Sequence, residues 1–127
     1  MAATRPEETN EVFAAAINRG DVEAALAMYE PNACLVGTPG ETAVGTDAIR
    51  AVLQNLVDAG PTLTVVPGSV LQVDELAVTV HAWTATADGP DGPLELGGHA
   101  VEVMRRQPDG TWRFVIDDPY GGAPPAV

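Results

Sequence analysis

The sequence predicts a single α+β domain spanning residues 1–127, in which a curved, antiparallel sheet wraps around three N-terminal helices. Apolar residues recur at helical spacing before Pro61, whereas after Pro61 they alternate with polar residues as in strands. The strands follow one another through short turns, which favours antiparallel pairing. Neither a linker nor an internal repeat divides the chain. These observations predict one layer of helices against one sheet.

Three helices are expected in the first half of the chain. The first covers residues 6–18 and carries an apolar stripe at helical spacing. Asp21 is expected to cap a second helix over residues 22–29. Thr46 is expected to cap the third, over residues 47–58, whose apolar positions match one helical face closely. Two short strands are expected between the second and third helices, at residues 33–36 and 42–45.

The second half of the chain is expected to form four longer strands. Pro67-Gly68 predicts a bulge or bend in the first of them. Asp88 to Pro93 is expected to form a loop, because this segment is rich in Gly, Pro and Asp. Residues 1–5 and 121–127 are expected to be flexible. The four strands are predicted at residues 63–73, 76–87, 94–106 and 111–117.

The charge balance is strongly acidic, with 18 Asp and Glu against 6 Arg and a formal net charge of −12. Such a charge opposes contact with nucleic acid or anionic membranes, so neither is expected as a partner. No apolar run is long enough to span a membrane, and the N-terminus lacks the apolar core of a signal peptide. The single cysteine, Cys34, fits a reducing compartment. A cytoplasmic location is therefore expected.

Several segments resemble one known superfamily. They are FAAAINRGDVEAALAMYEPNACLVG (residues 13–37), the Gly-Thr-Asp helix start at 45–47 and RRQPDGTWRFVIDDPYG at the end of the chain. Together they resemble the nuclear transport factor 2-like (NTF2-like) superfamily, in its SnoaL-like and ketosteroid-isomerase-like branches. The resemblance implies a cone-shaped mixed sheet with helices across its mouth. It also implies an apolar pocket for a small hydrophobic molecule, and a homodimer. We expect no cofactor, and we expect the homodimer to form through the outer sheet face.

The site of the ketosteroid isomerases carries over only in part. Their first-helix tyrosine falls on Phe13, which has no hydroxyl, and their general-base aspartate falls on about Gly37. Their oxyanion-stabilising aspartic acid falls near Glu102. Two of the three parts are missing, so steroid isomerisation by that mechanism is not expected. The superfamily hosts many reactions on one fold, and the function must be inferred from the site.

Two carboxylates are the candidate catalytic groups, Glu102 and Asp117. The resemblance places both in the pocket, where burial raises a carboxyl pKa and where two such groups interact. The alternatives are that Glu102 faces solvent or pairs with an arginine, and that Asp117 or Asp118 caps the turn at Pro119. The residues expected to line the pocket with these carboxylates are Phe13, Tyr29, Val80, Ala82, Thr84, Ala100, Met104 and Val115.

His81 and Trp83 share the opposite face of their strand from Val80, Ala82 and Thr84, so they are expected to face outward into a dimer interface. A shift of one residue in register would reverse that assignment. The two histidines lack the spacing of a metal site, so no metal is expected.

Two functions remain open from the sequence. One is a cofactor-independent isomerase, cyclase or hydrolase that moves protons with Asp117 and Glu102. The alternative is a non-catalytic ligand-binding or dimerisation module of the same fold. An open cavity with two converging carboxylates would favour the first, and a cone filled by side chains would favour the second.

Overall fold

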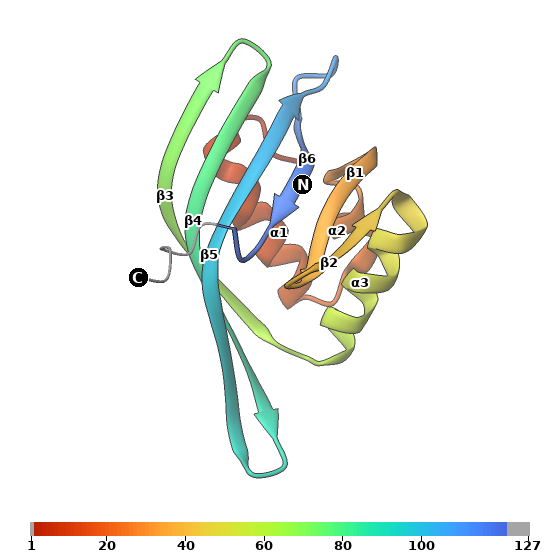
Figure 1. Ribbon diagram of the computed structural model, residues 1–127, viewed down its shortest axis with the longest axis vertical. Coiled ribbons are helices and arrows are strands. Elements are labelled where there is room, and N and C mark those ends of the chain that lie inside the picture. Colours follow the sequence, from red (N-terminus) through yellow and green to blue (C-terminus); the bar gives the residue numbers. More distant parts are fainter. Residues whose placement is uncertain (1, 122–127) are drawn as a thin grey trace.

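The computed structural model describes residues 2–121 of the chain (Figure 1). A short 3-10 helix, η1, precedes the first α-helix, and the six strands follow the order expected from the sequence. The elements are η1 (Pro6–Glu8), α1 (Thr9–Asn18), α2 (Val22–Leu26), β1 (Tyr29–Thr38), β2 (Glu41–Val44), α3 (Thr46–Asp58), β3 (Thr62–Val73), β4 (Leu76–Gly89), β5 (Gly92–Arg106) and β6 (Trp112–Asp118).

The six strands form one curved, open sheet in the order β2-β1-β6-β5-β4-β3. Strands β1 and β6 run parallel, and the other neighbours run antiparallel, so the sheet is mixed. The helices gather on one side of the sheet, within its curve (Figure 1). The expected α+β fold class, a curved sheet around N-terminal helices, is confirmed.

The core forms where the helices meet the concave face of the sheet. Three aromatic rings pack edge to face at its centre: the ring centroids of Phe13 and Phe114 are 5.9 Å apart, and those of Phe13 and Tyr29 are 6.1 Å apart. Helix α3 contributes Ile49 and Leu53, both fully buried. These positions are four residues apart, so they lie on one helical face, as the apolar spacing predicts.

The second helix is shorter than expected, because α2 ends at Leu26 and β1 begins at Tyr29. Strand β1 runs through Pro31. Its pairing with β6 is irregular between Tyr29 and Cys34, so the missing N–H of the proline falls where the ladder is already interrupted. Thr46 does not cap α3: the cap position is Gly45, at a φ of 88°, and no side chain caps it.

Strand β3 contains the expected irregularity, because its register with β4 shifts between Pro67 and Ser69. A β-carbon on Gly68 would overlap the carbonyl group of Val80, so the bulge requires a glycine at this position. The prediction of a bulge at Pro67-Gly68 is confirmed.

The loop predicted at residues 88–93 is wrong in extent. Strand β4 continues to Gly89 and β5 starts at Gly92, which pairs with it, so only Pro90 and Asp91 form the turn. Gly92 has a φ of 117°, which a residue with a side chain rarely adopts. The result is a long two-stranded arm that projects away from the rest of the molecule (Figure 1).

Ala3, near the start of the chain, packs against the body of the domain. Ala3 is buried, and its carbonyl accepts a hydrogen bond from the N–H of Trp112 at 2.9 Å. This contact joins Ala3 to β6. Most of the other segment expected to be flexible, residues 122–127, lies outside the described residues. Within residues 2–121, the structure contains no helix with the length and apolar character that crossing a membrane requires.

Candidate active site

A cavity of about 540 Å³ lies between the concave face of the sheet and helices α1 and α3. Its lining is mostly apolar and comes from every layer of the fold. The apolar lining residues are Phe13, Leu35, Val36, Ala43, Val52, Leu53, Leu56, Leu63, Val65, Trp83, Ala85, Leu96, Ala100 and Phe114. A cavity of this size and character suits a small, largely apolar molecule.

Four buried polar side chains also line the cavity: Tyr29, His81, Glu102 and Asp117. The two carboxylates lie on neighbouring strands, because Glu102 of β5 pairs directly with Asp117 of β6. Directly paired residues have their β-carbons about 5 Å apart. The sheet therefore brings together the two carboxylates that the sequence singles out.

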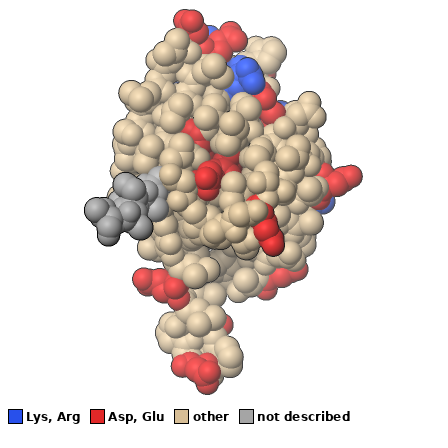
Figure 2. All heavy atoms as spheres, viewed as in Figure 1, with Lys and Arg blue, Asp and Glu red and all other residues tan. Residues whose placement is uncertain are grey.

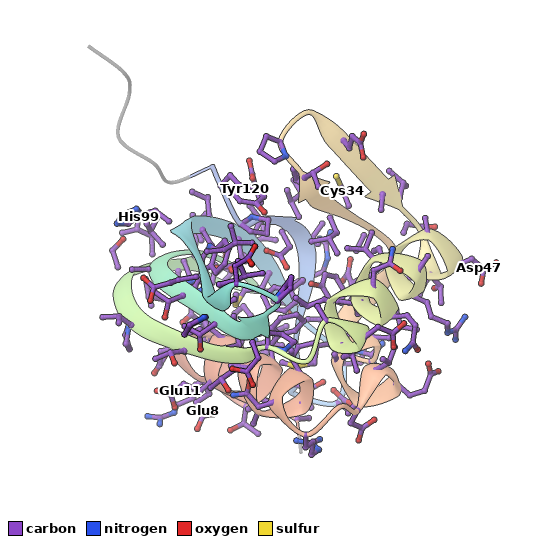
Figure 3. The ribbon with its side chains drawn as sticks, turned by 90° about the horizontal axis from the view of Figure 1, so that it is seen from below. Glu8, Glu11, Cys34, Asp47, His99 and Tyr120 are labelled. Atoms are coloured by element: carbon purple, nitrogen blue, oxygen red, sulfur yellow. The ribbon has the colours of Figure 1, made fainter. Side chains whose placement is uncertain are left out.

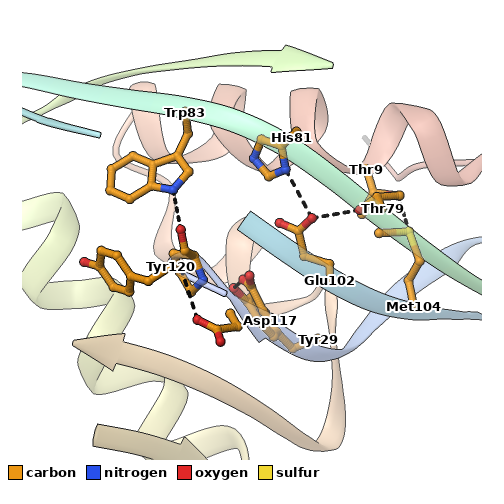
Figure 4. A network of polar contacts seen from close by, with 11 residues as sticks. Thr9, Tyr29, Thr79, His81, Trp83, Glu102, Met104, Asp117 and Tyr120 are labelled. Carbon is orange, nitrogen blue, oxygen red and sulfur yellow. Dashed lines mark hydrogen bonds and ion pairs between the residues drawn. The ribbon is translucent and has the colours of Figure 1, made fainter. Parts of the chain in front are cut away.

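Glu102 is held by two partners on strand β4 (Figure 4). Its Oε1 atom accepts a hydrogen bond from the Thr79 hydroxyl at 2.7 Å and lies 3.2 Å from Nδ1 of His81. Only 3% of the glutamate is exposed. The alternative of a solvent-facing or arginine-paired Glu102 is therefore wrong. With the imidazole proton on Nδ1, His81 donates to Glu102 and keeps a free lone pair on Nε2.

Asp117 is held by Tyr29, whose hydroxyl donates a hydrogen bond to Oδ2 at 2.6 Å. Burial raises the pKa of Asp117 to about 8, with further contributions from the charges of Glu102 and Asp118, while the bond from Tyr29 acts in the opposite direction. Burial, together with the charge of Asp117, raises the pKa of Tyr29 well above its usual value. Asp117 therefore carries a proton at neutral pH and can donate a hydrogen bond.

Pro119 and Tyr120, which follow β6, form part of the cavity wall beside Trp83. The indole N–H of Trp83 donates to the carbonyl of Pro119 at 2.7 Å, and the rings of Trp83 and Tyr120 meet edge to face at 5.8 Å (Figure 4). Asp118 accepts a hydrogen bond from the backbone N–H of Tyr120, which fits the alternative role of a turn cap. A β-carbon on Gly98 would lie 3.1 Å from the indole nitrogen, so a glycine leaves room for this contact.

The face of β4 that lines the cavity is opposite to the predicted one. Thr79 pairs with Glu102 and His81 with Ala100, so the odd-numbered residues of β4 face inward. His81, Trp83 and Ala85 line the cavity as a result. The predicted lining residues Val80, Ala82 and Thr84 point to the outer side of the sheet. The prediction that these residues face inward and the prediction that His81 and Trp83 face outward are both wrong, by one residue of register.

Of the remaining predicted lining residues, Phe13, Tyr29 and Ala100 line the cavity. Met104 shares their side of the sheet but lies in the closed core, where its sulfur accepts a hydrogen bond from the Thr9 hydroxyl at 3.4 Å.

Val115 does not line the cavity, because the register between β5 and β6 shifts at this point. Val103 pairs with Ile116 and Met104 with Phe114, which leaves Val115 as an extra residue in β6. This bulge places Phe114 and Asp117 on the same side of the sheet. Asp117 therefore faces inward together with Phe114, whereas Val115 does not share its side of the sheet.

The functional contacts that sequence reasoning missed are those of His81, Thr79, Trp83 and Tyr120. The second histidine, His99, faces outward and is exposed (Figure 3). Across residues 2–121, no three His, Cys, Asp or Glu side chains converge as a metal ion would require. The polar groups of the cavity are a neutral acid, Asp117, beside a glutamate that holds an imidazole.

The sequence of residues 10–117 matches the SnoaL-like domain family. Solved structures with a similar fold include a ketosteroid isomerase-like protein from Erwinia carotovora atroseptica, with 21% identity, a TM-score of 0.78 and coverage of 88% of this chain and 89% of that one. An NTF2-like protein with a cystatin-like fold from Novosphingobium aromaticivorans has 19% identity and a TM-score of 0.76, and the match covers 88% of this chain and 76% of that one. These likenesses show the fold. No curated protein gives a match to this chain.

Proposed function

This chain belongs to the SnoaL-like domain family, and from that premise and the geometry of its cavity we propose that it catalyses cofactor-independent proton transfer on a small, largely apolar carbonyl compound. This is the chemistry of the isomerases and cyclases expected from the sequence. The proposal is carried by one observation: Asp117 and Glu102 pair across β5 and β6 and are buried together in an apolar cavity. This burial raises the pKa of Asp117 to about 8.

Asp117 acts as the electrophilic group in this proposal. A carbonyl oxygen that enters the cavity can accept a hydrogen bond from the protonated carboxyl group. When a proton leaves the adjacent carbon, negative charge develops on that oxygen, and a neutral acid in a dry site stabilises it strongly. Tyr29 keeps the carboxyl group oriented through its 2.6 Å hydrogen bond.

His81 acts as the base, and Glu102 works through it. In the tautomer that donates to Glu102, Nε2 is free to take a proton from the carbon next to the carbonyl. The imidazolium that forms is then stabilised by the carboxylate 3.2 Å from Nδ1. The proton returns from Nε2 to a carbon of the enolate, so the reaction needs no external oxidant or reductant.

The residues proposed for proton transfer differ from those of the ketosteroid isomerases that this chain resembles. The positions matched to their tyrosine and their general base, Phe13 and Gly37, supply only an apolar ring and a backbone segment to the cavity wall. The hydroxyl comes instead from Tyr29 on β1, and the base comes from His81 on β4. The proposal is therefore for proton transfer with a different set of residues.

The second candidate function is a non-catalytic binder of apolar molecules. The observation that favours it is the apolar lining of a 540 Å³ cavity, which alone would bind such a molecule. The converging polar groups favour catalysis, because burying two carboxylates and an imidazole costs stability that a simple binder has no need to lose.

Deuterium exchange tests the proposal without knowledge of the natural substrate. Methyl ketones with alkyl groups of several lengths are incubated with the protein in D₂O, and loss of the protons next to the carbonyl is followed by NMR. We expect exchange above the buffer rate. Asp117→Asn and His81→Gln are each expected to lower it about 100-fold or more.

Asp118→Asn is the matched control, because Asp118 bonds the backbone of Tyr120 and an asparagine oxygen can replace it there. This variant should keep most of the exchange activity. Ketone binding without exchange in the wild-type protein would favour the non-catalytic binder. Exchange that survives both Asp117→Asn and His81→Gln would overturn the assignment of the residues.

A further inference from the structure

The arm formed by residues 85–96 has two faces of different character. Strand alternation and the pairing of Ala85 with Leu96 and Ala87 with Leu94 place these four side chains on one face. The opposite face carries Thr86 and its partner Glu95. The arm is thus an amphipathic ribbon, with an apolar strip that is two side chains wide.

The apolar strip continues the wall of the cavity. Ala85 and Leu96 already line the cavity, and Ala87 and Leu94 are the next inward-facing pair along the same two strands. Two residues of a strand span about 6.8 Å, so the strip extends the wall beyond the mouth. Leu96 is 67% exposed and Leu94 is 59% exposed, so nothing within residues 2–121 covers them.

The charges around the strip limit what can lie on it. Residues 85–96 include Asp88, Asp91 and Glu95 and no basic residue, and acidic side chains mark the end of the arm in Figure 2. These carboxylates, together with the formal charge of −12 on the whole chain, repel an anionic ligand. An uncharged hydrocarbon chain is not repelled, and its width suits a strip of two side chains.

We propose that the substrate carries an extended, uncharged apolar tail, which leaves the cavity past Leu96 and lies along the strip to Leu94. The inference rests on the proposed function for the position of the carbonyl end, and it adds the class of substrate: a long-chain carbonyl compound. The carbonyl end of the substrate binds at Asp117, and the affinity for the substrate depends on how much of its tail lies on the arm.

Two matched series of ligands test the tail and the head separately. One series is methyl ketones from methyl propyl to methyl nonyl ketone, and the other is the linear alkanes of equal length. Binding is followed by the fluorescence of Trp83, which lines the cavity, with Trp112→Phe removing the second indole. We expect affinity in both series to rise by up to about fourfold for each added methylene, because each buries a further apolar unit.

Leu94→Asn is the decisive variant, because Leu94 is exposed and its replacement removes no core contact. We expect it to leave the shortest ketone unchanged and to lower the affinity of the longest about tenfold. Thr86→Asn is the control, because it adds the same side chain to the polar face of the arm. Ala87→Leu should have the opposite effect and strengthen binding of the longest ligands.

The outcomes separate the two proposals. A Leu94→Asn variant with the same dependence on length as the wild-type protein overturns the tail inference, and so does an affinity that does not rise with length. Equal affinity for ketones and alkanes of the same length, with a normal dependence on length, supports the tail and contradicts the proposed role of Asp117. A Leu94→Asn variant that changes only self-association would assign the strip to a second copy and overturn the inference.

Discussion

Burial and the facing charge of Glu102 raise the pKa of Asp117 to about 8, while the hydrogen bond from Tyr29 lowers it. The residue is 5% exposed, so water cannot solvate its charged form. A carboxyl group that is neutral at pH 7 is unusual and can serve as a hydrogen-bond donor. The chemistry at this position therefore depends on its surroundings more than on the residue type.

Asp117→Asn should change how stability depends on pH. The folded pKa of about 8 lies above the unfolded value of about 3.9, so between these values the folded protein binds one proton more than the unfolded chain. The contribution is fully present below about pH 4 and is lost as pH rises to about 8. Asparagine does not titrate, and it can still accept the bond from Tyr29.

Thermal unfolding of both proteins from about pH 5 to about pH 9 measures this effect. We expect the Tm of Asp117→Asn relative to that of the wild-type protein to rise with pH and to level off above about pH 8. A difference in Tm that does not vary with pH would show that Asp117 has an ordinary pKa in the folded protein.

Tyr29→Phe should shift the alkaline limit of activity. The hydroxyl lowers the pKa of Asp117, so its removal should raise that pKa and keep the carboxyl group protonated to higher pH. The rate of ketone exchange in D₂O, measured against pH, should fall off later in Tyr29→Phe than in the wild-type protein. Tyr120→Phe removes a hydroxyl from another residue that lines the cavity and should leave that limit in place. A limit that stays or moves to lower pH in Tyr29→Phe contradicts this account.

At the scale of the elements, strand β4 shows why the lining of the cavity could not be assigned from the sequence. Alternation correctly separates its residues into two sets, but it does not say which set faces inward. The aliphatic set, including Val78 and Val80, suggests a core, yet this set lies on the outer side of the sheet. The inward set holds Thr79 and His81, whose polar groups are satisfied by Glu102. Only the pairing with β5 distinguishes the two.

Strand β6 shows a different limit. Simple alternation groups Asp117 with Val115, whereas the bulge groups it with Phe114. No Gly or Pro marks this bulge, since strand β6 (Trp112–Asp118) contains neither residue. The bulge in β3 was predictable, since Pro67-Gly68 marks it, and so was the order of the elements. Turn and breaker residues therefore predicted the order of the helices and strands. The bulge in β6, which no such residue marks, determines which β6 residues line the cavity.

Gly68→Ala tests the marked bulge. The new β-carbon would overlap the carbonyl group of Val80, so either the bulge or the pairing with β4 must shift. We expect a loss of about 1–3 kcal/mol in the free energy of unfolding, measured with urea. Ser69→Ala, an exposed change at the next position, should cost less than about 0.5 kcal/mol. Equal stability of the two variants would contradict the requirement for glycine.

At the scale of the whole molecule, the outer side of the sheet is unusually apolar for a surface. Several aliphatic side chains are exposed there, and a large exposed apolar patch marks an interaction site. The exposed aliphatic residues of this face include Val66, Leu71, Val73, Leu76, Val78 and Ile116. We propose that two copies pair through this face, which the sequence already suggested. The face lies away from the cavity, so pairing would leave the site open.

Val78→Lys tests this pairing. A charge placed on the apolar face should be costly to bury between two copies. By sedimentation equilibrium we expect the wild-type protein to be a dimer and Val78→Lys to be a monomer. Thr86→Lys adds the same charge on the arm and should remain a dimer. A monomeric wild-type protein, or a dimer that tolerates Val78→Lys, would exclude the outer face as the interface.

The resemblance stated from sequence predicted the fold because it depends on turns, caps and apolar spacing spread over most of the chain. The family and the curved mixed sheet are confirmed. The site depends on a few distances between strands far apart in the sequence, such as Tyr29 to Asp117. The resemblance identified Glu102 and Asp117 as candidates, whereas His81 could be assigned to the cavity only once the strand register was known.

The central claim is that Asp117 holds a proton at neutral pH inside the cavity. The most direct measurement is a ¹³C NMR titration of its carboxyl carbon, assigned by comparison with Asp117→Asn. We predict a midpoint near pH 8, which moves higher in Tyr29→Phe. A midpoint near the ordinary value of about 4 would contradict the claim, and with it the role of Asp117 as a hydrogen-bond donor to a substrate.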